Sequence, residues 1–201
     1  MRYRPNEDHR SLGRVRRGAR KGGLCSLALE LLTVSSREMT PSQLNDVIQL
    51  CSQVFQCDYS YYMNLPLDRV HVLGYIDGLL VSHALWLDRR LRIGSGPWLN
   101  TAYVEGVATR EDRRKQGFGS AVMRRLQREI SGYDLGALSP SRPEWYERLG
   151  WVRWQGPLRI VKDSDILETP EECVLVYRTP RTREVDVTSP LIGEWRPFEL
   201  W

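Results

Sequence analysis

The chain has 201 residues, of which 41% are hydrophobic and 27% charged, a composition typical of one globular domain with a full core. No window approaches the roughly 18 apolar residues of a membrane span, and no secretory h-region is present. We therefore expect a cytoplasmic protein without a membrane partner. The formal charge of +4 is uneven, because residues 1–25 hold eight basic and two acidic residues, a net +6, and the remainder carries −2.

The basic segment, residues 1–25, is polar and glycine-bearing with almost no apolar periodicity, so we interpret it as a disordered arm. A nucleic-acid arm, a transit peptide and translated sequence upstream of the true start all stay open, and we assign the arm no function. Its basic residues are not interleaved with aromatic ones, so no nucleic-acid partner is predicted. Residues 26–201 are predicted to form a single domain.

The four cysteines show neither CxxC spacing nor a cluster with histidine. We therefore predict free thiols in a reducing compartment and no metal site. The cysteines are Cys25, Cys51, Cys57 and Cys173.

Local signals predict the first elements of the domain, beginning with a strand over 27–34. Thr40 as N-cap and Gln43 form a capping box, and Pro41 occupies the first helical position, so a helix should run from Pro41 to about Phe55. Asp77-Gly78 is typical of a type I′ turn and predicts a hairpin of residues 70–75 and 79–87.

Two features between these elements have competing interpretations. The aromatic segment 56–66 is either a loop whose tyrosines pack on the core or a substrate lid, because tyrosine offers stacking area and a hydroxyl. His83 lies among apolar residues of the hairpin, and we interpret it as a hydrogen-bonded core residue rather than a catalyst.

The stretch from Tyr103 to Ser120 combines a buried strand over 103–108, a charged turn, a glycine-bearing basic loop and a helix N-terminus. The first N–H groups of a helix lack internal partners and carry partial positive charge, so this unit predicts an anion site. Gly117 and Gly119 have no Cβ and let a phosphate approach the backbone. Neither GxxxxGK[ST] nor GxGxxG is present.

The remaining pattern predicts a strand at 135–139, a short helix from Pro143 that carries Tyr146 and ends at Gly150, and strands at 151–154 and 173–177. The resulting order, β-α-β-β-β-α-β-α-β-β, indicates an α+β domain with one mixed, mostly antiparallel sheet flanked by helices.

The Arg-x-x-Gly-x-Gly pattern of Arg114, Gly117 and Gly119 resembles the acyl-CoA loop of the GCN5-related N-acetyltransferase (GNAT) superfamily. The resemblance implies the GNAT fold, with splayed central strands, and acetyl-CoA as cosubstrate. It also implies the cofactor-binding set Val107, Thr109, Arg114, Lys115, Gln116, Gly117, Phe118, Gly119 and Ser120.

A longer ordered set of motifs is similar to the aminoglycoside 2'-N-acetyltransferases and covers roughly residues 30–201. It comprises residues 103–107, 135–139, Tyr146 before Gly150-Trp151, Trp154-x-Gly156-Pro157, Thr169-Pro170 and Glu194-Trp195-Arg196 closing on Trp201. The resemblance implies acetyl transfer to the 2'-amine of an aminoglycoside, which inactivates the antibiotic and confers resistance. Because the resembled enzymes are commonly dimers, it also implies a homodimer.

The chemistry requires a base, since an antibiotic amine is protonated at neutral pH, and Glu105 is our candidate, acting directly or through water. A carboxylate in a buried apolar strand is costly unless it has a partner or a function. By resemblance, Tyr146 is the general acid and the Val107 N–H the oxyanion donor. The implied substrate-binding set is Asp58, Glu105, Gly106, Ser139, Glu172, Glu199 and the carboxylate of Trp201.

The sequence departs from the resembled family on the substrate side. Met63 stands where a second acidic residue is common, and the segment between Ser139 and Tyr146 is shorter. A less usual aminoglycoside of the kasugamycin type is therefore one prediction. Another small amine, a peptide N-terminus and a non-catalytic acyl-CoA module are the alternatives.

Overall fold

The computed structural model describes residues 28–163, 165–197 and 200–201. The predicted arm, residues 1–25, lies outside the described residues.

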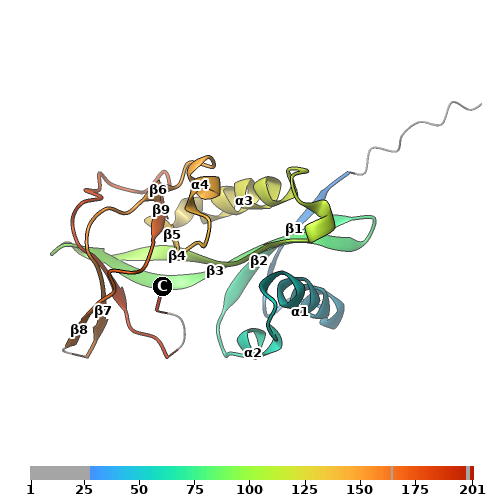
Figure 1. The fold of residues 1–201 in the computed structure, drawn as a ribbon, viewed down its shortest axis with the longest axis horizontal. Helices are drawn as coiled ribbons and strands as arrows, with labels where there is room; N and C mark the ends of the chain where they lie inside the picture. Colours follow the sequence, from blue (N-terminus) through green and yellow to red (C-terminus); the bar gives the residue numbers. More distant parts are fainter. Residues whose placement is uncertain (1–27, 164, 198–199) are drawn as a thin grey trace, which may run out of the picture.

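One mixed sheet forms the centre of the domain (Figure 1). Its strands lie in the order β6-β9-β5-β4-β3-β10-β7-β8, and β2 and then β1 continue the sheet from β3. The pairs β4-β5 and β10-β7 are parallel, and the other strand pairs of the described residues are antiparallel, as predicted. The strands are β1 (Glu30–Ser35), β2 (Arg69–Ile76), β3 (Leu79–Ile93), β4 (Trp98–Thr109), β5 (Leu135–Leu138), β6 (Val152–Arg153), β7 (Leu158–Lys162), β8 (Asp165–Glu168), β9 (Leu175–Tyr177) and β10 (Leu191–Glu194).

Helices cover both faces of this sheet: α3 and α4 lie on one face, and α1 and α2 lie on the other (Figure 1). The C-terminal segment lies on the same side as α1 and α2. The helices are α1 (Pro41–Phe55), α2 (Ser60–Met63), the 3₁₀ turns η1 (Glu111–Arg113) and η2 (Ile130–Gly132), α3 (Phe118–Glu129) and α4 (Pro143–Glu147).

The capping box predicted at the start of α1 is confirmed. Thr40 Oγ1 accepts a hydrogen bond from the Gln43 N–H, and Gln43 Oε1 accepts one from the Thr40 N–H. The helix ends at Phe55, where Gln56 adopts a left-handed conformation with φ of 56°. A left-handed residue at this position terminates the helix.

The two parallel central strands, β4 and β5, pair only over Thr101–Tyr103, and β4 then continues to Thr109 without β5. The predicted splay of the central strands is therefore confirmed. Between His83 and Leu85 the register of β3 against β4 shifts, with Gly106 at a φ of 60° in the left-handed region. This is the geometry of a glycine β-bulge, which bends β4 and leaves a residue out of the regular ladder.

The C-terminal segment is held by a buried tryptophan. Only 4% of Trp201 is exposed, its indole N–H donates to Thr169 Oγ1 at 2.8 Å, and it packs in a core cluster with Tyr103 and Trp154. This cluster lies on the sheet face opposite to Val104 and α3, whose apolar side chains form a separate cluster.

The structure adds elements to those predicted. The 56–66 segment contains α2, β3 extends to Ile93, and β4 starts at Trp98. Strands β7, β8 and β10 were not predicted, so the expectation that the last strand lies at 173–177 was wrong. These strands pair with partners distant in the sequence, as β10 does with β3.

Candidate active site

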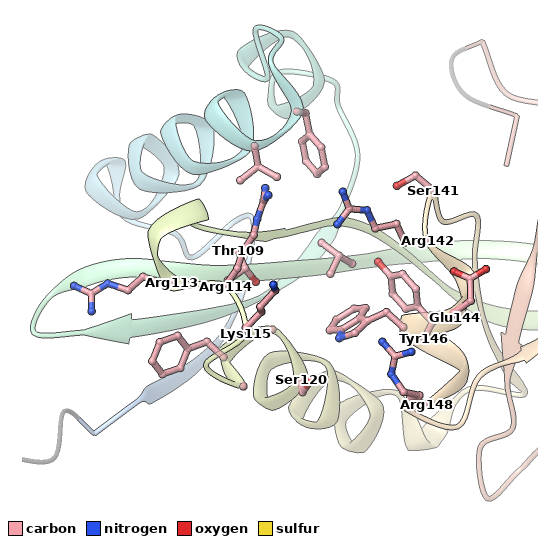
Figure 2. A pocket seen from close by; sticks show the side chains of 17 residues that line it. Thr109, Arg113, Arg114, Lys115, Ser120, Ser141, Arg142, Glu144, Tyr146 and Arg148 are labelled. Carbon is pink, nitrogen blue, oxygen red and sulfur yellow. The ribbon is translucent and has the colours of Figure 1, made fainter.

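A cavity of about 860 Å³ opens where β4 leaves β5, between the C-terminal end of α1, the N-terminus of α3, and α4 (Figure 2). Val54 and Phe55 of α1 line one side, and Trp145 of α4 lines another. Of the sequence-predicted residues, the cavity brings together Val107, Thr109, Arg114, Lys115, Gly117, Phe118, Gly119, Ser120 and Tyr146.

The loop before α3 has a backbone suited to anion binding. Lys115 and Gly117 adopt left-handed conformations, with φ of 61° and 87°, and Gly117 is the N-cap of α3. Successive N–H groups around such residues form a concave nest, and the first N–H groups of the helix have no intrahelical partner. A Cβ on Gly119 would lie 2.9 Å from Thr109 Oγ1, so a side chain there would push the loop off the strand.

Charge in the cavity is predominantly positive. Arg142 and Arg148 join Arg113, Arg114 and Lys115 in the lining, with Glu144 as the lining acid (Figure 2). Sequence reasoning missed Arg142 and Arg148, because they flank the short α4 as its N-cap and C-cap residues and do not belong to the glycine loop. The cavity is therefore matched to a polyanionic ligand.

Gln116 is the one predicted loop residue that does not line the cavity. Its side-chain amide instead donates to the backbone oxygen of Asp112 at 3.2 Å and ties the loop to η1.

Tyr146 lies in the cavity wall beside Arg142, with its hydroxyl turned toward the cavity (Figure 2). Its ring packs edge-on against Trp145 at a centroid distance of 4.7 Å. Burial raises the pKa of Tyr146, so the phenol keeps its proton at neutral pH.

Glu105 lies two residues before Val107, but its side chain contacts different elements. Tyr62 of α2 donates a hydrogen bond to Glu105 Oε2, and Arg196 of the C-terminal segment forms an ion pair with Oε1 at 2.6 Å. The Glu105 and Arg196 side chains are 16% and 9% exposed. A buried carboxylate is costly without such partners, and the sequence did not reveal either of them.

Tyr103 is a buried residue of β4 whose ring contacts two arginines on the substrate side. Burial is the main cause that raises the pKa of Tyr103; Glu105 and Glu172 raise it further, while Arg89 and Arg196 lower it. Both guanidinium groups lie over its ring, at 4.6 and 5.4 Å from the centroid.

Ser139 and Trp201 extend this substrate-side group. Ser139 Oγ donates to Glu172 Oε2 at 3.4 Å, and Arg196 donates to the Trp201 backbone oxygen at 3.4 Å. Arg196 thus links Glu105 to the C-terminal residue.

Two predicted substrate residues are not brought into this group. Asp58 is exposed at the start of α2, where hydrogen bonds from the Ser60 side chain and N–H lower the pKa of its carboxyl. Glu199 lies outside the described residues.

Gly106 joins the cavity side of β4 to the carboxylate side. Its carbonyl oxygen lies 2.7 Å from His83 Nδ1, and a Cβ at Gly106 would lie 2.7 Å from the Tyr59 hydroxyl. The interpretation of His83 as a hydrogen-bonded core residue is confirmed, since it is fully buried.

Among the described residues, no group of His, Cys, Asp or Glu side chains is arranged to hold a metal ion. Within the same residues, no helix is long and apolar enough to cross a bilayer.

The fold and the cavity define the class of protein. A family profile described as an acetyltransferase (GNAT) domain matches residues 35–153, so the chain belongs to the GNAT acetyltransferases. A curated relative, the aminoglycoside 2'-N-acetyltransferase of Mycolicibacterium fortuitum, is 35% identical over 162 residues, which cover 74% of this chain and 80% of the relative. The resemblance read from the sequence is confirmed, and the protein is an acetyltransferase enzyme.

Solved structures share the fold. YhbS of Escherichia coli, a GNAT family N-acetyltransferase solved in complex with CoA, matches with a TM-score of 0.58 and 17% identity, over 86% of this chain and 96% of that one. A probable N-acyltransferase from Enterococcus faecalis V583 matches with a TM-score of 0.53 and 16% identity over 65% of this chain. This chain spans 33% of the length of the Enterococcus protein.

Proposed function

We propose that this enzyme transfers the acetyl group of acetyl-CoA to the 2'-amine of an aminoglycoside, including the kasugamycin type, and so confers resistance. The proposal depends on one observation about β4, which contributes a residue to each of two regions. Val107 lines the cationic cavity beside the N-terminus of α3. Two residues earlier, Glu105 contacts Arg196, which also binds the C-terminal residue Trp201. The 35% identical relative of that activity supports the same substrate class.

The cavity fits acetyl-CoA, which supplies an activated thioester when bound. Its volume of about 860 Å³ lies in the usual range for cofactor clefts, and the backbone before α3 supplies the N–H groups that a diphosphate needs. Arg114 and Lys115 neutralise phosphate charge, and Gly117, Phe118, Gly119 and Ser120 supply backbone donors.

Glu105 removes the proton from the substrate ammonium, directly or through a water molecule. Arg196 forms an ion pair with this side chain, and an incoming substrate ammonium competes with Arg196 for the carboxylate oxygen. With acetyl-CoA bound, the free amine would attack the thioester carbon, the C–S bond would break, and the Val107 N–H would donate to the oxygen that gains negative charge. Tyr146 would protonate the departing thiolate, and the second proton of the attacking amine would restore the phenol.

A polycationic sugar requires acidic contacts around the reacting amine. We assign this role to Glu172 with Ser139, to the Trp201 carboxylate, and to Glu199 and Asp58, whereas the Gly106 carbonyl is engaged by His83 and is not assigned to the substrate. The contacts of Arg196 with Glu105 and with the Trp201 backbone oxygen, and that of Ser139 with Glu172, support it.

The test is release of CoA thiol with matched acceptors. Tobramycin carries an amine at the 2' carbon and kanamycin A a hydroxyl, so thiol release with tobramycin and not with kanamycin A is expected. Kasugamycin extends the panel, and expression of the gene should raise the inhibitory concentration of each accepted antibiotic. Absence of transfer to every 2'-amino aminoglycoside would overturn the proposal.

Another amine is the second candidate substrate, and the position of Met63 favours it. Met63, which stands where the resembled enzymes commonly have an acid, is buried in the core beneath α1 and cannot contact a substrate. Transfer to small amines or peptide N-termini, with none to aminoglycosides, would establish this alternative.

Glu105→Gln tests the role of the carboxylate. We expect kcat to fall by about 10²–10⁴, the usual contribution of a general base, with little change in the KM for acetyl-CoA. Gln keeps the shape and can still accept from Tyr62, so a folded variant with unchanged kcat at saturating aminoglycoside would remove Glu105 from the chemistry.

A further inference from the structure

A chain of buried polar groups crosses the core to the bulge in β4, and the mechanism above does not use it. Ser36 Oγ lies 2.9 Å from His71 Nε2, His71 Nδ1 lies 2.9 Å from His83 Nε2, and His83 Nδ1 lies 2.7 Å from the carbonyl oxygen of Gly106. Both histidines are fully buried. This series of hydrogen-bonded groups ends at Gly106, which lies between Glu105 and Val107 in β4.

The direction of every hydrogen bond in this chain follows from its last member. A carbonyl oxygen can only accept, so His83 Nδ1 carries a proton. Burial lowers the pKa of His83 to about 4 and that of His71 to about 2, so both rings are neutral at pH 7. His83 Nε2 is therefore unprotonated and accepts a hydrogen bond from His71 Nδ1–H. His71 Nε2 in turn accepts one from the Ser36 hydroxyl.

The last bond determines where the next N–H points. The Gly106 C=O and the Val107 N–H belong to one planar trans peptide, in which they point in opposite directions. His83 holds the carbonyl in the core, so the N–H points away from His83, and Val107 lines the cavity. Because Gly106 is a glycine with φ of 60° at a bulge, its backbone could rotate easily without this bond.

We propose that His83 is a positioning residue: its Nδ1–H fixes the Gly106–Val107 peptide so that the Val107 N–H faces the thioester oxygen of the acetyl donor. This inference rests on the proposed function, in which Val107 is the oxyanion donor. Cys51, whose Sγ lies 3.6 Å from His83 Nδ1, completes the buried surroundings of the ring.

Asparagine and leucine have nearly the same shape, so His83→Asn and His83→Leu form a matched pair. Both remove the Nε2 acceptor that faces His71 Nδ1, and Asn, unlike Leu, can place an N–H donor near the position of Nδ1. We expect the kcat of His83→Leu to fall about 10- to 100-fold. This decrease is at most that caused by removing one oxyanion donor completely. The dissociation constant of CoA itself, which has no carbonyl at sulfur, should stay unchanged, and His83→Asn should recover most of kcat.

Equal kcat in the two variants, with the wild type active, would overturn the role of His83 and leave the proposed function standing. A wild type that acetylates no aminoglycoside would instead refute the proposed substrate, and the pair would then be compared with the amine that the enzyme accepts. ¹⁵N NMR of the wild type is independent of both outcomes: we expect protonated Nδ1 and bare Nε2 at His83 at pH 7. The opposite tautomer would exclude a bond to Gly106 and overturn the inference.

Discussion

Arg114 and Glu105 are the two charged residues on which the proposed chemistry depends, and their surroundings differ. Arg114 is 43% exposed at the cavity, and its nearest carboxylate oxygen, in Glu111, is 3.9 Å away. Glu105 is 16% exposed and makes a close ion pair. Because exposed ion pairs contribute little to folding, Arg114 should act on ligand affinity rather than on stability.

Arg114→Ala should raise the KM for acetyl-CoA about tenfold, the cost of a charge-assisted contact to phosphate at a partly exposed site. The KM for the aminoglycoside should change much less. Steady-state kinetics with each substrate varied in turn will measure both values. Arg124→Ala, on the exposed side of α3, is the control for the loss of one positive charge. A larger effect on the aminoglycoside KM would contradict the assignment of Arg114 to the diphosphate.

At the scale of elements, α1 links the core to the site. Val47, Leu50 and Cys51 bury one face of this helix, while Val54 and Phe55 in its last turn line the cavity. The helix begins at a capping box that satisfies two backbone N–H groups. A loss at this cap should lower stability without touching the catalytic groups.

Thr40→Ala removes the side-chain acceptor of that cap. The free energy of unfolding should fall by about 1 kcal/mol and Tm by about 2–4 °C for a domain of this size. Thermal unfolding followed by circular dichroism provides the measurement. Ser42→Ala, an exposed position in the same first turn, should change Tm much less. Identical shifts in the two variants would mean that the cap contributes no stability of its own.

At the scale of the whole molecule, what could be predicted depends on how far apart the partners lie in the sequence. The start of α1 and the hairpin at Asp77-Gly78 were predicted because their signals are local, and both residues of that turn have positive φ. Strands β7 and β10 lack such signals. They pair with each other in parallel, 33 residues apart at Leu158 and Leu191, and only the folded core specifies that register.

In the candidate site, too, the contacts that could be predicted are those between residues close in the sequence. The loop residues from Arg114 to Ser120 are contiguous, so their shared cavity could be anticipated, except for the rotation of Gln116 toward Asp112. The partners of Glu105 could not be anticipated from the sequence, because Tyr62 comes from α2 and Arg196 from the C-terminal segment. Likewise His83 could be predicted to be buried, but not to bond His71 and Gly106.

The paired histidines make the stability of the whole domain depend on pH. In the unfolded chain a histidine gains a proton below a pKa of about 6.5. In the folded protein burial lowers the pKa to about 4 for His83 and to about 2 for His71, and the charges of His83 and then Arg69 contribute to the lowering at His71. Between pH 6.5 and 4 the unfolded state therefore binds more protons than the folded state, and stability is lost as the pH falls.

Acidification from pH 7 to 5 should lower the free energy of unfolding by about 3–4 kcal/mol from these two histidines together, since each contributes up to about 1.4 kcal/mol per pH unit. Urea unfolding at a series of pH values measures this change. The double variant His71→Asn/His83→Asn should be less stable than the wild type at pH 7, but its free energy of unfolding should fall less over the same interval because it lacks both titrating groups. A wild-type slope no steeper than that of the double variant would show that the buried rings already carry protons in the folded state, and the one-directional hydrogen-bond chain from Ser36 to Gly106 would then be wrong.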